Sequence, residues 1–202
     1  MIEQTVRTKP ARQHLLEATR TALARDGFEG ITTRRIAEAA GVNIATLHYH
    51  FGSKEALLAE AVRFTLTTVA QQTFAAMQDA PSLRDALQAG FQAFWSIVRD
   101  QPGTIRLELT VRGFRDETAR LIAAEIHDTL TKSLEGLFDR LAPERRLEPR
   151  LPLQRIARYM VSTMDGILLT FYATRDEEKA LEEFVLLRDH VLYLLGETEV
   201  GR

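Results

Sequence analysis

The chain has 202 residues, of which 45% are hydrophobic and 27% are charged, a composition typical of a folded protein with a sizeable core. It contains no cysteine, which excludes disulfide bonds and thiolate metal sites and suits the reducing cytoplasm. The formal net charge of −2 excludes a uniformly basic surface, and no apolar run approaches the roughly 18 residues of a membrane-spanning helix. We therefore expect a cytoplasmic protein without a membrane partner.

Helix signals run through the whole chain, and the alternating patterns of β-strands are absent from it. Pro10 suits a first helical position, Asn43 and Ser53 can cap the helices that follow them, and Thr174 begins a capping box. The sequence therefore predicts an all-α fold. Its roughly nine helices are expected at about 10–25, 32–40, 44–50, 53–69, 82–98, 105–111, 116–141, 153–172 and 178–195.

Two of the short helices have the pattern of a helix-turn-helix. Gly41, Val42 and Asn43 separate them, and the tight turn of this motif favours a glycine with a left-handed backbone. The small side chain of Ala37 permits the two helices to approach closely. The N-terminal residues of the second helix, over 44–50, would then enter the major groove of DNA.

The residues of this segment resemble the DNA-binding region of TetR-type repressors. The matching stretches, which contain no insertion, are Thr33-Arg-Arg-Ile-Ala, Ala40-Gly-Val, Thr46-Leu-His-Tyr-His-Phe and Ser53-Lys-Glu-Ala-Leu. The match covers roughly residues 11–58, and the rest of the chain is similar to the family in size and helical layout. The resemblance implies a three-helix DNA-binding domain over 1–54 and a larger helical ligand-binding and dimerisation domain over 55–202.

The distribution of charge agrees with this division into two domains. Residues 1–54 carry eight Lys and Arg against five Asp and Glu, whereas residues 55–202 carry 18 against 23. A basic head on an acidic body suits a small nucleic-acid-binding module joined to an effector domain. This charge asymmetry is mild, so by itself it is only weak support for a DNA-binding N-terminal domain.

The resemblance divides the DNA-binding residues into two groups by their chemistry. The residues expected to contact phosphates are Thr33, Tyr49, His50 and Lys54. The residues expected to read base edges are Arg34 and, on the helix that Asn43 caps, Ile44, Ala45, Thr46 and His48. Two of them depart from the family: Ile44 replaces a polar residue, so its contact would be apolar, and His48 replaces a commoner tyrosine.

Each of these residues also has a simpler interpretation. Arg34 on a surface helix can be solvated without touching a base, and Tyr49 can merely pack. His48 and His50 suggest a metal site, but residues two apart on a helix face different directions. We therefore expect no metal and no cofactor. Leu47 is expected in the core.

The last two predicted helices have the pattern of an interface. Their apolar residues cover a wide arc that one small domain does not easily bury. In TetR-like proteins the matching pair forms a four-helix bundle across a two-fold axis, so we expect a homodimer through these helices; an ordinary monomer core is the alternative. The apolar residues concerned are Leu153, Ile156, Met160, Met164, Ile167, Leu168, Phe171, Leu181, Phe184, Val185, Leu187, Val191, Leu192 and Leu195.

Aromatic residues, methionines and a few polar groups in the C-terminal domain suit a cavity for a small apolar or aromatic effector. They are equally suited to the core. Asp165 is more informative, because a buried carboxylate needs an arginine, a helix N-terminus or a ligand cation as partner. The candidate ligand-binding residues are Phe91, Trp95, Phe114, His127, Met160, Met164, Asp165 and Tyr172.

The function that these patterns indicate is a ligand-responsive transcriptional regulator. The resemblance implies a repressor that a small molecule releases from a palindromic double-stranded DNA operator; activation remains an alternative. The sequence shows no Gly-rich phosphate loop, nucleophile elbow or metal-binding His-Glu-x-x-His helix, so no enzyme is expected. A helical dimer that no longer binds DNA is the other alternative.

Overall fold

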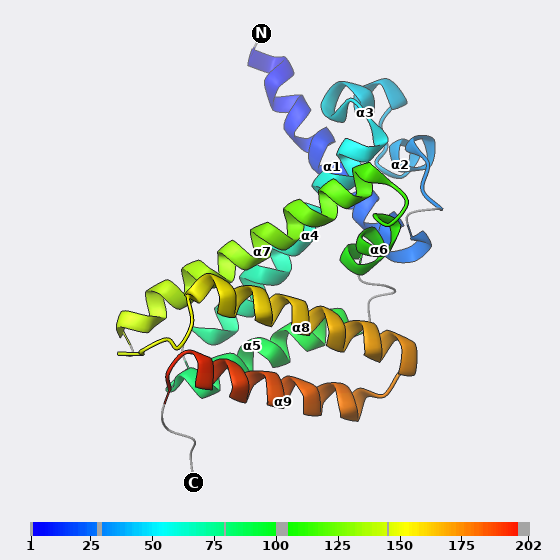
Figure 1. The fold of residues 1–202 in the computed structure, drawn as a ribbon. Helices are drawn as coiled ribbons and strands as arrows, with labels where there is room; N and C mark the ends of the chain where they lie inside the picture. The colour runs from blue at the N-terminus through cyan, green and yellow to red at the C-terminus, as the bar shows by residue number, and fades with distance from the viewer. Residues whose placement is uncertain (1, 28–29, 79, 100–104, 145, 198–202) are drawn as a thin grey trace. The chain divides into compact units, whose positions relative to one another are not determined.

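The protein is all-helical in the computed structural model, which describes residues 2–27, 30–78, 80–99, 105–144 and 146–197 (Figure 1). These residues form nine helices and no strand, which confirms the predicted fold class. In chain order the helices are α1 (Ile2–Asp26), α2 (Thr33–Ala39), α3 (Ile44–Phe51), α4 (Lys54–Met77), α5 (Leu83–Val98), α6 (Ile105–Arg112), α7 (Glu117–Glu144), α8 (Leu153–Thr174) and α9 (Glu177–Leu194). No helix among the described residues is long and apolar enough to cross a membrane.

The helices belong to two compact units. The first unit comprises Met1–Ala70 and Val98–Ile122, and the second comprises Gln71–Ile97 and Ala123–Arg202. The chain therefore passes from one unit to the other three times, each time within a helix: in α4, at the last residue of α5 and in α7. The expected domain boundary after residue 54 stays a prediction.

The first unit is built around the contacts of α1, α2 and α3, which pack against one another. Its core consists of aliphatic side chains that are at most 2% exposed, and Thr19 satisfies its buried hydroxyl by donating to the Leu15 carbonyl at 2.6 Å. These side chains recur at helical spacing, which is why the short helices α2 and α3 are stable here. The core residues are Leu15, Leu23, Ile31, Ile36, Leu47 and Leu57.

The local signals at helix ends were mostly interpreted correctly. Asn43 caps α3 by accepting a hydrogen bond from the Thr46 amide at 2.8 Å, and the Ser53 hydroxyl accepts one from the Ala56 amide at 3.1 Å. Two expectations were wrong. Helix α1 begins at Ile2, so Pro10 lies inside it. The cap of α9 is Asp176, because this carboxylate reaches the Lys179 amide, whereas Thr174 still belongs to α8.

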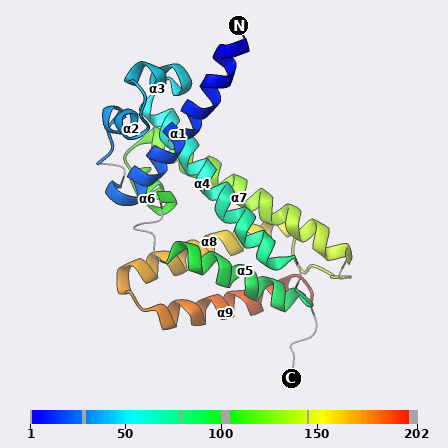
Figure 2. The same ribbon diagram turned by 180° about the vertical axis from the view of Figure 1, so that it is seen from behind.

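The second unit holds α8 and α9 side by side as an antiparallel pair, in both views of the molecule (Figures 1 and 2). Most of the apolar residues expected at an interface are buried here within the chain itself, among them Ile156, Leu168, Leu187 and Val191. Most of the apolar residues that predicted a dimer are thus part of the core of the single chain. Any partner must therefore use another face of these helices.

Candidate DNA interface

The turn between α2 and α3 has the geometry that the motif requires. Gly41 adopts a φ of +66°, which is in the left-handed region that glycine favours, and the Val42 amide donates to the Ala37 carbonyl at 3.0 Å. Leu47 is fully buried, so it anchors α3 to the first unit. The turn and the anchor together fix which face of α3 is exposed.

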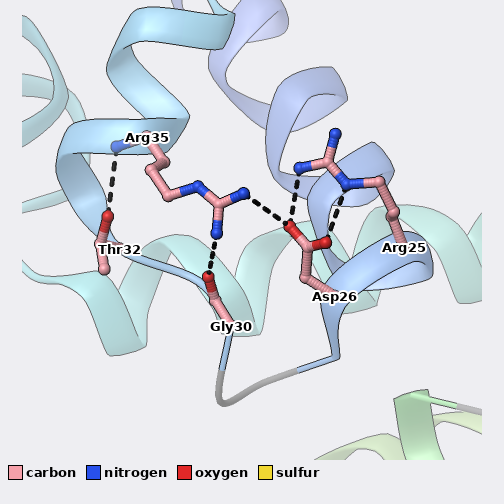
Figure 3. A network of polar contacts seen from close by, with 5 residues as sticks. All are labelled: Arg25, Asp26, Gly30, Thr32 and Arg35. Carbon is pink, nitrogen blue, oxygen red and sulfur yellow. Dashed lines mark hydrogen bonds and ion pairs between the residues drawn. The ribbon is translucent and has the colours of Figure 1, made fainter.

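A polar network holds the start of α2 against the end of α1 (Figure 3). The Arg35 guanidinium donates to the Gly30 carbonyl at 3.0 Å and pairs with Asp26 at 3.5 Å. The Arg25 guanidinium donates to both oxygens of the same carboxylate, and these hydrogen bonds lower the pKa of Asp26. Thr32 caps α2 through the Arg35 amide. Arg35 therefore stabilises the fold.

Gly30 of the same network lies so close to Asp26 that no side chain fits there. A Cβ atom at this position would lie 2.6 Å from the Asp26 Cβ and 2.8 Å from the Asp26 carbonyl oxygen. Real Cβ atoms essentially never come so close to backbone, so only glycine permits the chain to pass the end of α1 here. The path of this loop determines where Thr32 begins α2.

The recognition helix α3 divides into a buried and an exposed side. Leu47 and Phe51 face the core, whereas Ile44 is 45% and Tyr49 is 78% exposed. Ala45 and His48 are exposed as well. A large apolar side chain and a tyrosine held in water on so short a helix suit contacts with another molecule. This face contains Ile44, Ala45 and His48, three of the residues that the sequence predicts to read bases.

The candidate base-reading residues with polar side chains already have partners within the protein. The Arg34 guanidinium donates to Glu38 at 3.0 Å, the Thr46 hydroxyl donates to Asn43 at 2.9 Å, and His48 Nδ1 lies 3.1 Å from the Gly52 carbonyl oxygen. Arg34 and Glu38 are both exposed, so this ion pair is weak and can be exchanged for a base or a phosphate. The bonds of Thr46 and His48 instead orient the side chains.

The candidate phosphate-binding residues lie around the same helix. Thr33 at the start of α2 and His50 in α3 are half-buried, and the His50 ring packs edge-on against Tyr49 with ring centroids 5.1 Å apart. Lys54 is the first residue of α4, where unpaired backbone N–H groups also favour an anion. Lys54 also lines a small cavity of about 70 Å³ with Arg112 and Asp116 of the same unit.

Sequence reasoning missed Arg12. Its guanidinium lies 5.4 Å from the centre of the Phe51 ring at the end of α3, and it forms an ion pair with Glu60 of α4. One side chain of α1 thereby links the recognition helix to the helix that follows it. The sequence carries no signal for this, because Arg12, Phe51 and Glu60 are far apart along the chain.

The candidate ligand-binding residues differ in their burial and in the unit to which they belong. Phe91 and Trp95 are buried in an aromatic cluster with Phe184, and the indole N–H of Trp95 donates to Glu177 at 2.9 Å. Met160 is buried, and four candidates are half-buried: His127, Met164, Asp165 and Tyr172. Burial raises the pKa of the Tyr172 phenol.

Phe114 differs from the other candidates in its unit and in its exposure. It belongs to the first unit, whereas they all belong to the second, and it is 82% exposed. The second unit also has a groove between α8 and α9, with a volume of about 400 Å³, which the sequence did not indicate. Its lining includes Gly166, Thr170 and Ala180. Among the described residues no cluster of side chains suits a metal ion.

Comparisons with known proteins agree with the helix-turn-helix. Residues 15–61 match the family model described as bacterial regulatory proteins of the tetR family. The transcriptional repressor AcnR of Corynebacterium efficiens is 27% identical over 158 residues, which cover 78% of this chain and 80% of AcnR. The transcriptional regulator BetI of Brucella anthropi is 27% identical over 193 residues, covering 92% and 94%.

The fold is also similar to that of solved structures. A TetR-family regulator of Cytophaga hutchinsonii superposes with a TM-score of 0.76 at 19% identity, over 97% of this chain and 98% of that one. NemR of E. coli in its reduced form superposes with a TM-score of 0.69 at 18% identity, over 92% and 97%. These relatives are regulators and not enzymes, which confirms the expectation from the sequence.

Proposed function

We propose that this chain, whose residues 15–61 match the tetR family of bacterial regulatory proteins, is a homodimeric repressor with a palindromic operator. A small apolar or aromatic molecule that binds the C-terminal helical domain, residues 55–202, releases it from the DNA. The observation that carries the proposal is the exposed face of α3, where Ile44, Ala45, His48 and Tyr49 are held outward by a buried Leu47.

In this proposal the side chains divide into base readers and phosphate binders as the sequence predicted. The base readers Arg34, Ile44, Ala45, Thr46 and His48 face the major groove, and Asn43 holds the first turn of α3 by its cap. The phosphate binders Thr33, Tyr49, His50 and Lys54 fix the position of the head on the duplex.

The homodimer is proposed to form through exposed stripes on α8 and α9. Exposed residues spaced by four and three positions are Ser162, Gly166, Leu169 and Ala173 on α8 and Leu186, His190 and Tyr193 on α9. Leu169 is 55% and Leu186 is 64% exposed, so both leave apolar surface in water. A second copy is the occupant that buries it.

Gly166 supports the same arrangement. It lies inside α8, where glycine is less stable than alanine by about 0.5–1 kcal/mol. A Cβ atom on Gly166 would meet nothing within 4 Å, so the chain itself does not require a glycine there. Close approach of a partner helix explains it. A two-fold dimer places two copies of α3 on one face of the duplex, and this is why a palindrome is expected.

The effector is proposed to bind among seven of the eight residues expected from the sequence, which are Phe91, Trp95, His127, Met160, Met164, Asp165 and Tyr172. All seven belong to the second unit, whereas Phe114 belongs to the first, and they combine aromatic and thioether surface with polar groups. Release requires that the effector bind the DNA-free arrangement more tightly, and a difference of about 2–3 kcal/mol weakens operator binding tens to a hundredfold. Quenching of Trp95, the single tryptophan, would report binding of aromatic compounds.

The proposal is tested by selecting genomic fragments with the full chain and titrating the selected duplex with salt. Arg34→Ala is expected to lose about 1–3 kcal/mol of affinity and to relax the preference at one base step. Lys54→Ala is expected to weaken all sequences equally and to reduce the salt slope by about 0.9. If no fragment binds better than random DNA at low salt, the chain is a helical dimer without an operator.

A further inference from the structure

We propose that His48 reads the adenine of an A·T base pair, and that its Nε2 atom accepts a hydrogen bond from the exocyclic amino group of that adenine. The inference rests on the proposed function, because it requires α3 to lie in the major groove. It goes further by naming the base that one side chain recognises and the atom that recognises it.

The hydrogen bond of the His48 ring determines which nitrogen carries the proton. Nδ1 lies 3.1 Å from the carbonyl oxygen of Gly52. A carbonyl oxygen only accepts hydrogen bonds, so Nδ1 is the donor. In the neutral imidazole the other nitrogen, Nε2, then has a lone pair and no hydrogen. His48 is exposed, and its ring has no second hydrogen bond among the described residues.

The end of α3 holds the acceptor of this bond in place. Gly52 follows the last residue of the helix with a φ of +73°, and its amide donates to the His48 carbonyl at 2.9 Å. The backbone and the ring of His48 are thus both bonded to Gly52. The side chain that leaves the helix is oriented before DNA arrives, which lowers the entropy lost on binding.

The neighbours of His48 over residues 44–46 add no hydrogen-bond donor. Ile44, one helical turn earlier, and Ala45 are apolar and exposed. Thr46 uses its hydroxyl hydrogen on Asn43, so its side chain offers a methyl group and oxygen lone pairs. Over residues 44–48 the exposed face therefore presents methyl groups and hydrogen-bond acceptors.

An A·T base pair has the complementary pattern in the major groove. Adenine offers the N6 amino group as a donor, and its thymine partner offers a methyl group. Cytosine also offers an amino group, but a G·C pair has no methyl group for Ile44 or Ala45 to contact. Guanine O6 and thymine O4 are acceptors, which the Nε2 lone pair of His48 would repel.

The alternative is that His48 only caps the end of α3. Under that alternative His48→Ala would weaken binding to every sequence equally, because the helix end would loosen without losing a base contact. His50→Ala is a matched control, since it removes the same side chain two residues later, from a proposed phosphate contact. It is expected to keep the base preference and to lower affinity uniformly.

The experiment selects binding sites from randomised duplexes at pH 8 with the full chain and with both variants. The wild-type protein is expected to prefer an A·T pair at one position in each half-site. His48→Ala is expected to lose that preference alone, by about two- to tenfold, the usual net contribution of one hydrogen bond. An unchanged preference in His48→Ala, or a wild-type preference for G·C at the position it controls, would overturn the assignment.

Two further measurements test the same assignment. Replacing that adenine by purine, which lacks the amino group, should weaken wild-type binding two- to tenfold and leave His48→Ala unaffected; an equal loss in both proteins would overturn the assignment. In the free protein, ¹⁵N NMR of the imidazole should show the proton on Nδ1, and a proton mainly on Nε2 would also overturn it. If wild-type protein enriches no sequence, the proposed DNA binding itself fails.

Discussion

Leu169→Ala is expected to weaken dimerisation strongly without unfolding the monomer. Fully burying a leucine side chain contributes about 1.5–3 kcal/mol, and Leu169 leaves 55% of its surface exposed in the single chain. Covering that surface in a dimer therefore contributes roughly 1–1.5 kcal/mol per copy. The two-fold axis doubles the effect to about 2–3 kcal/mol, which is a 30- to 150-fold rise in the dimer dissociation constant.

The chain offers a closely matched control for this substitution. Leu121 on α7 is also 55% exposed, but it belongs to the first unit and not to the proposed interface. Leu121→Ala should leave the dissociation constant unchanged, which sedimentation over a range of concentrations measures. Equal effects of the two substitutions would refute the assignment of the face, and a wild-type mass of 22.9 kDa at micromolar concentration would refute the dimer.

Three further substitutions test other parts of the structure. Gly166→Ala should stabilise the dilute monomer by about 0.5–1 kcal/mol in denaturant unfolding and weaken the dimer in sedimentation. An unchanged dimer dissociation constant would contradict the close approach of a partner helix at Gly166. Gly30→Ala should destabilise the first unit by about 1–3 kcal/mol, seen as a lower Tm, because its Cβ would overlap Asp26. The lowered pKa of Asp26 implies stability that is present above the ordinary aspartate pKa of about 3.9 and lost as pH falls through the lower folded value. Asp26→Asn should reduce this acid-dependent loss in unfolding measured from pH 6 to 2, and an unchanged pH profile would contradict the network.

The recognition motif was predictable from the sequence because its signals are local. Asn43 and Ser53 cap the helices they precede, and Gly41 takes the left-handed conformation. Each of these roles depends on residues within four positions, so spacing alone indicates it. The same local reasoning failed at Pro10, where the helix continues through a residue that usually begins one.

What the sequence did not indicate depends on contacts between distant residues. Arg34 and Arg35 are adjacent and chemically alike, yet Arg34 pairs with Glu38 on its own helix and Arg35 reaches Gly30 and Asp26. Periodicity also does not distinguish a core from an interface, since both need apolar residues every three or four positions. For this reason the buried arc of α8 and α9 resembled an interface, while the exposed stripe with Leu169 went unnoticed.

The contacts of Arg12 contribute little to stability, but they link two helices of the first unit. An exposed ion pair contributes about 0–1 kcal/mol, and a cation–π contact at an exposed site about 0.5–1 kcal/mol, so neither decides whether the first unit folds. Both contacts nevertheless act on the same guanidinium, which joins Phe51 at the end of α3 to Glu60 in α4. Because α4 continues from the first unit into the second, a shift of α4 would act on Arg12 and on α3 together. A weak contact at this place can therefore couple the recognition helix to the part of the chain that is proposed to bind the effector.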